Sequence, residues 1–182
     1  NDASNTIPST EKQKDLGKYL FEELKTLGIR ECHMDEYGYV YGYIPSNCNS
    51  ANTIGLIAHL DTSDEASCKD VKPQIIEKYD GGVILLNQEL NLLLDPDEFS
   101  YLKKQIGHEL ITTDGTTLLG ADDKAGIAII MTVIDELIHG EVKYPNIIVT
   151  FTPDEEIGRG TDAFNYQYYL EKGCKIAYTL DG

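Results

Sequence analysis

The feature that most constrains this chain is a pair of adjacent aspartates, Asp122 and Asp123, in the segment 120–126, which glycines bound at both ends. An apolar run over residues 127–134 follows directly and predicts a buried helix. Neighbouring carboxylates repel each other and are tolerated best where a cation neutralises them. The pair therefore predicts either a metal site at a loop-to-helix junction or a helix N-terminus, where acids cap backbone amides.

Acids and a histidine at the ends of predicted strands favour the metal site. Residues 53–58 form a short apolar run typical of a buried strand, and His59 and Asp61 follow it. Side chains two positions apart on a strand face the same way, so this imidazole and this carboxylate project together. The runs 147–151 and 175–180 predict two further strands. The acids that follow them are Asp154, Glu155, Glu156 and Asp181.

The alternation of predicted strands and helices indicates an α/β fold, with a mainly parallel or mixed sheet flanked by helices. Helices are expected from residue 9 to 27, from 122 to 138 and from 161 to 170, and a small hairpin is expected over 37–44. Thr10 and Gln13 are spaced as a capping box at the start of the first helix. The long segment 63–119 is interpreted as an insertion with short strands. In such sheets the functional crevice lies beyond the carboxyl ends of the strands.

Charge and cysteine usage limit the partners and the compartment. The 182 residues contain 31 acids and 15 bases, giving a formal charge of -16. This charge argues against nucleic acid and anionic membranes as partners. The four cysteines have no spacing typical of a zinc ribbon and are interpreted as reduced thiols of a cytoplasmic protein.

One imidazole and several carboxylates at one sheet edge suit two divalent ions bridged by a shared carboxylate. Zinc is favoured by the mixed nitrogen and oxygen ligands, while manganese and cobalt also fit them. A carboxylate that binds no metal would be free to act as a general base on metal-bound water.

Five segments together resemble the peptidase T family of tripeptide aminopeptidases, within a wider group of co-catalytic zinc exopeptidases and deacylases. The resemblance covers residues 6–182. The D-D-K-A-G and D-E-E motifs are shared across the wider group, whereas T-T-D-G-x-T-L-L-G-A-D-D and T-P-D-E-E point to the tripeptidase branch. The five segments are 58–63, 111–115, 119–128, 151–158 and 177–182.

The resemblance implies a role for each site residue. Asp122 would bridge two zinc ions, and the peptide bond after it is expected to be cis. Glu155 would be the general base, and Asp61 would orient the imidazole of the histidine ligand. The implied metal ligands are His59, Asp122, Glu156 and Asp181.

The resemblance also implies that residues 1–182 are an incomplete catalytic domain, the N-terminal part of a zinc-exopeptidase domain. The lid and dimerisation domain and the C-terminal return, with the last zinc-binding histidine, would lie outside it. The expected reaction releases the N-terminal residue of a small peptide, a tripeptide, and this segment alone is expected to be inactive. The alternatives are a dipeptidase, an N-acyl-amino-acid deacylase, or a non-catalytic metal-binding protein.

Overall fold

The computed structural model describes residues 3–181, which divide into two compact units. One unit consists of the chain up to Ser63 and from Ala121 onward, and the other is Asp64–Gly120. Every candidate site residue lies in the first unit. Among the described residues, none of the helices is long and apolar enough to cross a membrane.

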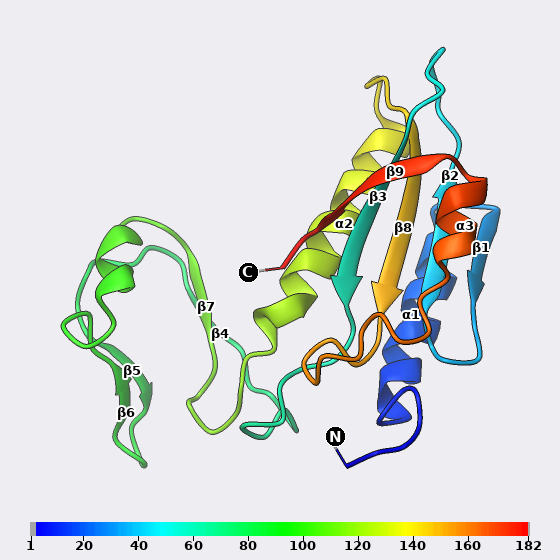
Figure 1. Cartoon of the computed structure of the whole chain (residues 1–182). Coiled ribbons are helices and arrows are strands. Elements are labelled where there is room, and N and C mark those ends of the chain that lie inside the picture. The colour runs from blue at the N-terminus through cyan, green and yellow to red at the C-terminus, as the bar shows by residue number, and fades with distance from the viewer. Residues whose placement is uncertain (1–2, 182) are drawn as a thin grey trace. The chain divides into compact units, whose positions relative to one another are not determined.

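The first unit is built on a five-stranded sheet with the order β1-β2-β8-β3-β9 (Figure 1). β3 pairs in parallel with β8 on one side and with β9 on the other, whereas β1, β2 and β8 pair antiparallel. The fold class predicted from the sequence is therefore confirmed, and the sheet is mixed. The strands are β1 (Glu31–Met34), β2 (Val40–Ile44), β3 (Thr53–His59), β8 (Asn146–Thr152) and β9 (Cys174–Thr179).

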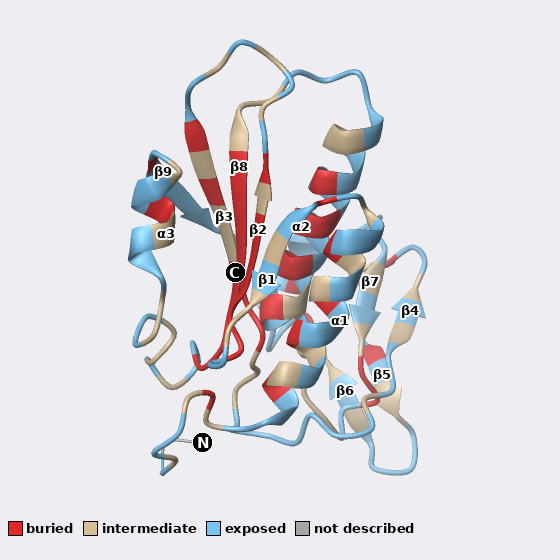
Figure 2. Cartoon of the chain, turned by 90° about the vertical axis from the view of Figure 1, so that its right-hand side faces the viewer, coloured by how far each residue is buried: buried red, intermediate tan, exposed pale blue. Residues whose placement is uncertain are grey.

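Two helices, α1 (Lys12–Thr26) and α2 (Ala121–His139), cover one face of this sheet (Figure 2). α1 buries Leu20 and Leu24 in a cluster with alternate side chains of the central strands. α2 buries only one of its faces there, although its sequence is apolar nearly all round. The α2 residues in this cluster are Ile127, Ile130, Met131 and Ile134, and those left exposed include Ile129 and Val133.

The short helix α3 (Tyr166–Glu171) lies on the opposite face of the sheet, where aromatic side chains form a second cluster (Figure 2). Tyr39, Tyr41 and Tyr169 are buried in it. The side chain of Ile57, on β3, packs against the same cluster, so the sheet is packed on both faces. Its carboxyl edge, where β3 and β8 end in register at His59 and Thr152, remains the place where loops carry the acids.

The second unit corresponds to the expected insertion and has a small core of its own around Tyr79, Ile84 and Leu102. It contains two antiparallel strand pairs and a 3-10 helix, η1 (Ser100–Lys104). β4 (Gln74–Ile76) pairs with β7 (Leu110–Thr112), and β5 (Ile84–Asn87) pairs with β6 (Leu92–Leu94).

Several local predictions were wrong. α1 begins at Lys12 without a side-chain cap, because the Gln13 side chain bonds to Asp154 and to the Thr10 hydroxyl and does not close a capping box on the backbone. The hairpin includes β1, whose short, half-exposed sequence carries no clear strand pattern. α3 starts only at Tyr166, where Asn165 caps it. β9 is an edge strand with mostly exposed side chains, not a buried strand.

Candidate metal centre

His59 is the last residue of β3, and its side chain is almost completely buried. Nε2 lies 2.8 Å from Oδ1 of Asp122. Nδ1 lies 3.1 Å from the backbone oxygen of Asp61 and 3.4 Å from its Oδ1. The ring is thus held from both nitrogens, and the carbonyl contact at Nδ1 favours the tautomer that leaves Nε2 as the metal-facing atom.

The two adjacent aspartates, Asp122 and Asp123, have different hydrogen-bond partners. Both depart from helical backbone angles at the start of α2, and the peptide bond between them is cis, as the resemblance implies. Asp123 is buried, accepting the His59 amide at Oδ2 (3.0 Å) and the Gly126 amide at Oδ1 (3.1 Å). Asp122 points to the His59 ring. Asp123 therefore joins the start of α2 to the end of β3, while the Asp122 carboxylate stays accessible.

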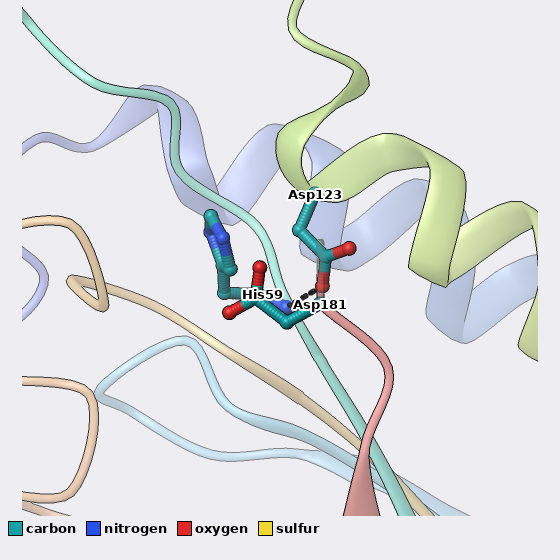
Figure 3. A group of neighbouring side chains, drawn as sticks. All are labelled: His59, Asp123 and Asp181. Atoms are coloured by element: carbon teal, nitrogen blue, oxygen red, sulfur yellow. Dashed lines mark hydrogen bonds between the residues drawn. The ribbon is translucent and has the colours of Figure 1, made fainter. Parts of the chain in front are cut away.

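Gly126 allows α2 to pass close to the segment after β9. A Cβ at this position would collide with the Leu180 carbonyl oxygen and with the Asp123 carboxylate. The same close approach brings Asp181 to the site. Figure 3 shows His59, Asp123 and Asp181, which come from three separate segments and meet here.

Asp61 organises the loop that follows β8. Its two carboxylate oxygens accept the backbone amides of Glu155 (3.0 Å) and Glu156 (3.1 Å). Glu156 in turn accepts the Ser63 amide at Oε1, at 2.8 Å. One carboxylate therefore faces the imidazole of His59 and also fixes the two glutamates.

Two groups of three side chains bring their ligand atoms within 4.8 Å of one another, close enough to hold a metal ion. One group is His59, Asp122 and Glu156, and the other is His59, Asp123 and Asp181. All four ligands implied by the resemblance lie in these groups. The sequence analysis did not include Asp123 among the ligands, because an acid at the start of a helix is usually a helix cap. The feature that distinguishes Asp123 from such a cap is its burial beside Asp181.

The charges around His59 favour its protonated form when no metal is bound. Burial lowers the pKa of His59, but hydrogen bonds to Asp61 and Asp122, with the charges of Asp61 and Asp123, outweigh burial and raise it to about 9. Burial would raise the pKa of Asp61, yet the imidazole and the two loop amides lower it below its ordinary value. A site that stabilises one positive charge here is suited to a cation.

Glu155 has a different electrostatic environment. Burial raises the pKa of its carboxyl, and the charges of Asp181, Asp61 and Glu156 add to this, while the charge of His59 opposes it. Its Oε2 lies 3.8 Å from Nε2 of His59, and it belongs to neither group of ligands. Glu155 also borders a cleft of about 630 Å³. A carboxylate so placed, with a raised pKa, can exchange protons with a bound molecule.

The donor chemistry fits a divalent cation. Imidazole nitrogen and carboxylate oxygen are the ligands that zinc and similar ions take in catalytic sites. The two groups place four carboxylates around a single histidine, an arrangement that a bound cation stabilises. The geometry brings together the four ligands that the resemblance implies and adds Asp123 to them.

The chain is similar in sequence to peptidases. It is 53% identical to peptidase T of Alkaliphilus oremlandii over 98% of its own length and 44% of the relative's. It is 55% identical to peptidase T of Caldanaerobacter subterraneus, again over 98% of its length and 44% of the relative's. The chain thus spans less than half the length of these curated relatives. No family model matches it.

Solved structures with the same fold include the aminopeptidase PepT of Bacillus cereus, with a TM-score of 0.67 and 25% identity over 98% of this chain and 39% of that one. A tripeptidase of Staphylococcus aureus matches with a TM-score of 0.64 and 24% identity over 98% of this chain and 39% of that one. At this identity the match supports a shared fold only.

The mixed sheet with acids at its carboxyl edge is the fold of the solved aminopeptidase structure from Bacillus cereus, of which the chain matches 39%. Over nearly its whole length the chain is similar to part of peptidase T, and the resemblance indicated by the motifs is confirmed.

Proposed function

We propose that this chain is the N-terminal part of the catalytic domain of a metal-dependent tripeptide aminopeptidase. The observation that carries the proposal is the loop after β8. Asp61 holds Glu155 and Glu156 by their amides, so that one glutamate joins the candidate ligands and the other stays unligated beside them. A site that only binds metal has no use for that second carboxylate. The relatives named peptidase T support a peptide substrate, and the motifs that resemble the tripeptidase branch support a tripeptide.

We assign two zinc ions to the complete domain, with Asp122 as the bridging ligand. His59, Glu156 and Asp181 would complete the ligand set that this chain provides. Support comes from the two groups that these side chains form around His59, and from the exposed Asp122 carboxylate, whose Oδ1 lies 2.8 Å from Nε2 of His59. When bound, the ions would polarise the peptide carbonyl and lower the pKa of a water molecule.

Glu155 is proposed as the general base and then the general acid. It would accept the proton of the attacking water and deliver it to the nitrogen of the departing dipeptide, releasing the N-terminal residue. Its raised pKa and its position at the cleft support this role. Asp61 would act indirectly, by orienting His59 and by fixing Glu155.

Small peptides are the proposed partners, and the cytoplasm is the proposed compartment. Cys32, Cys48 and Cys174 form no disulfide with any residue that the structure describes, which fits a reducing environment. The formal charge of -16 disfavours nucleic acid and anionic lipid surfaces.

The test uses the longer protein that carries this chain, loaded with zinc and assayed on trialanine, dialanine and acetylated amino acids. We expect hydrolysis of trialanine. In a Glu155→Gln variant, kcat should fall about 10²-fold or more while zinc content stays unchanged, because the base is lost and the ligands remain. Faster cleavage of dialanine than of trialanine would indicate a dipeptidase. Faster cleavage of acetylated amino acids than of trialanine would indicate a deacylase. Zinc binding without cleavage of any substrate would indicate a non-catalytic protein.

A further inference from the structure

The buried acid Asp154, directly before the two glutamates, has no part in the proposed chemistry. It is completely buried, and its backbone φ of 58° lies in the left-handed region that few residue types adopt. Within residues 3–181, no Lys, Arg or His side chain forms an ion pair with it. A buried carboxylate without such a partner must be satisfied by hydrogen bonds.

The partners of Asp154 come from the other end of the sequence, at the start of α1. The Ser9 amide donates to both carboxylate oxygens, at 3.0 and 2.8 Å. The Gln13 side chain bonds to Asp154 twice: Nε2 donates to Asp154 Oδ1 (2.7 Å), and Oε1 accepts the Asp154 amide (3.0 Å). Nε2 also donates to the hydroxyls of Thr10 (3.1 Å) and Ser9 (3.4 Å). Gln13 is itself buried.

Three consecutive amides of the loop after β8 are therefore held by side chains from two other elements. The amide of Asp154 is held by Gln13 of α1, and those of Glu155 and Glu156 are held by Asp61 after β3. The loop is fixed from two sides, and the two glutamates leave it at the site. Without Gln13, the Asp154 amide would lose its partner in a buried place, and Oδ1 of Asp154 would keep only the bond from the Ser9 amide.

We propose that Gln13 is a positioning residue for Glu155 and Glu156, acting through Asp154. The inference rests on the roles proposed above for the two glutamates. An amide side chain is required because it offers an acceptor to the Asp154 backbone and a donor to the Asp154 carboxylate at the same time. Glutamate at this position would bring two buried carboxylates together, and methionine would satisfy neither group.

The pairing can be inverted, which gives a sharp test. In a Gln13→Glu variant the new carboxylate faces that of Asp154. In the double variant Gln13→Glu with Asp154→Asn, the glutamate can accept both the residue-154 amide and the Asn side-chain amide, while the Asn oxygen accepts the Ser9 amide. Asn also tolerates a positive φ. Each single substitution should therefore disrupt the loop, and the double substitution should restore it.

The first readout is hydrogen exchange of the Glu155 and Glu156 amides, measured by NMR on the metal-free chain. We expect exchange at least about tenfold faster in Gln13→Glu and recovery in the double variant. The second readout is zinc affinity by calorimetry, expected to fall about 10- to 100-fold and to recover in the same way. If Gln13→Glu does not fold, Gln13→Met replaces it, without the recovery step.

Leu20→Ala is the control, because it destabilises α1 without touching the loop. When parent and variant are compared under conditions in which the same fraction of each is folded, Leu20→Ala should leave the exchange rates and the zinc affinity within about threefold of the parent values. Unchanged exchange at Glu155 and Glu156 in Gln13→Glu would overturn the proposal, as would a double variant no better than the singles. A longer protein that cleaves no peptide would refute the proposed function while leaving these exchange data valid for the positioning role.

Discussion

His59 lies among carboxylates that favour a positive charge, and the folded chain holds a proton there when metal is absent. The pKa of an imidazole in an unfolded chain is about 6.5, whereas that of His59 in the folded chain is about 9. Zinc binds the neutral imidazole, so it must displace this proton. The carboxylates around His59 that raise its pKa are also among the candidate ligands.

The stability of the metal-free chain should fall as pH rises from about 6.5 to 9. Below pH 6.5 the imidazole is protonated in both states, and its stabilising contribution is complete. Above the folded-state pKa it is neutral in both states, and the contribution is lost. A rise in pKa from 6.5 to about 9 corresponds to about 3 kcal/mol. Urea unfolding at a series of pH values measures this directly.

The control for the pH series is His59→Gln, which removes the titrating ring and should flatten the curve in this range. A parent curve that is equally flat would contradict the expectation. The same curve obtained with saturating zinc should lie above the metal-free one, most of all near pH 8 to 9, because metal and proton compete for Nε2.

At the level of elements, the site depends on how closely α2 approaches the segment after β9. Gly126→Ala should destabilise the chain by about 2 kcal/mol or more, because the new methyl group meets the Leu180 carbonyl and the Asp123 carboxylate. It should also weaken zinc binding, since Asp123 and Asp181 must move apart. Thermal unfolding and zinc titration measure the two effects.

Gly17→Ala in α1 is the matched control, because it adds the same methyl group to a helix in the same unit. Its new Cβ would lie 3.3 to 3.4 Å from Met34, Gly38 and Val40, a tight but adjustable fit. The gain in helix propensity, about 1 kcal/mol, offsets that cost. A Gly126→Ala variant as stable as Gly17→Ala would show that the segment after β9 is free to move away.

Features that depend on residues adjacent in the sequence could be predicted from it, whereas features that depend on distant contacts could not. β3 and β8 are apolar runs with His59 or acids directly after them, so the strands and most site residues were located from neighbours in sequence. The contact of Asp123 with the His59 amide spans 64 residues, and that of Gln13 with Asp154 spans 141. Neither leaves a local pattern. β1 and the short α3 were misjudged for the same reason, since tertiary packing decides short elements.

At the level of the whole molecule, the two units have separate cores and different tasks. The cluster that supports the site draws on α1, α2 and the sheet, whereas Tyr79, Ile84 and Leu102 form the core of Asp64–Gly120. The candidate metal ligands and Glu155 all belong to the first unit. We therefore expect that the ligands can assemble without the insertion.

Replacing residues 64–120 with a flexible linker of about eight residues should leave a folded chain that still binds zinc. The ends to be joined are near each other, because Nε2 of His59 and Oδ1 of Asp122 lie 2.8 Å apart and each of these residues is within four residues of a cut. Shortening the loop lowers the entropy cost of closing it, by about 0.6 kcal/mol for each halving of its length. Zinc affinity within about threefold of the parent, with cooperative thermal unfolding, is the expected result. Loss of zinc binding in a shortened chain that still unfolds cooperatively would mean that the insertion supplies order the ligands need, and the first unit could then no longer be regarded as sufficient for the site.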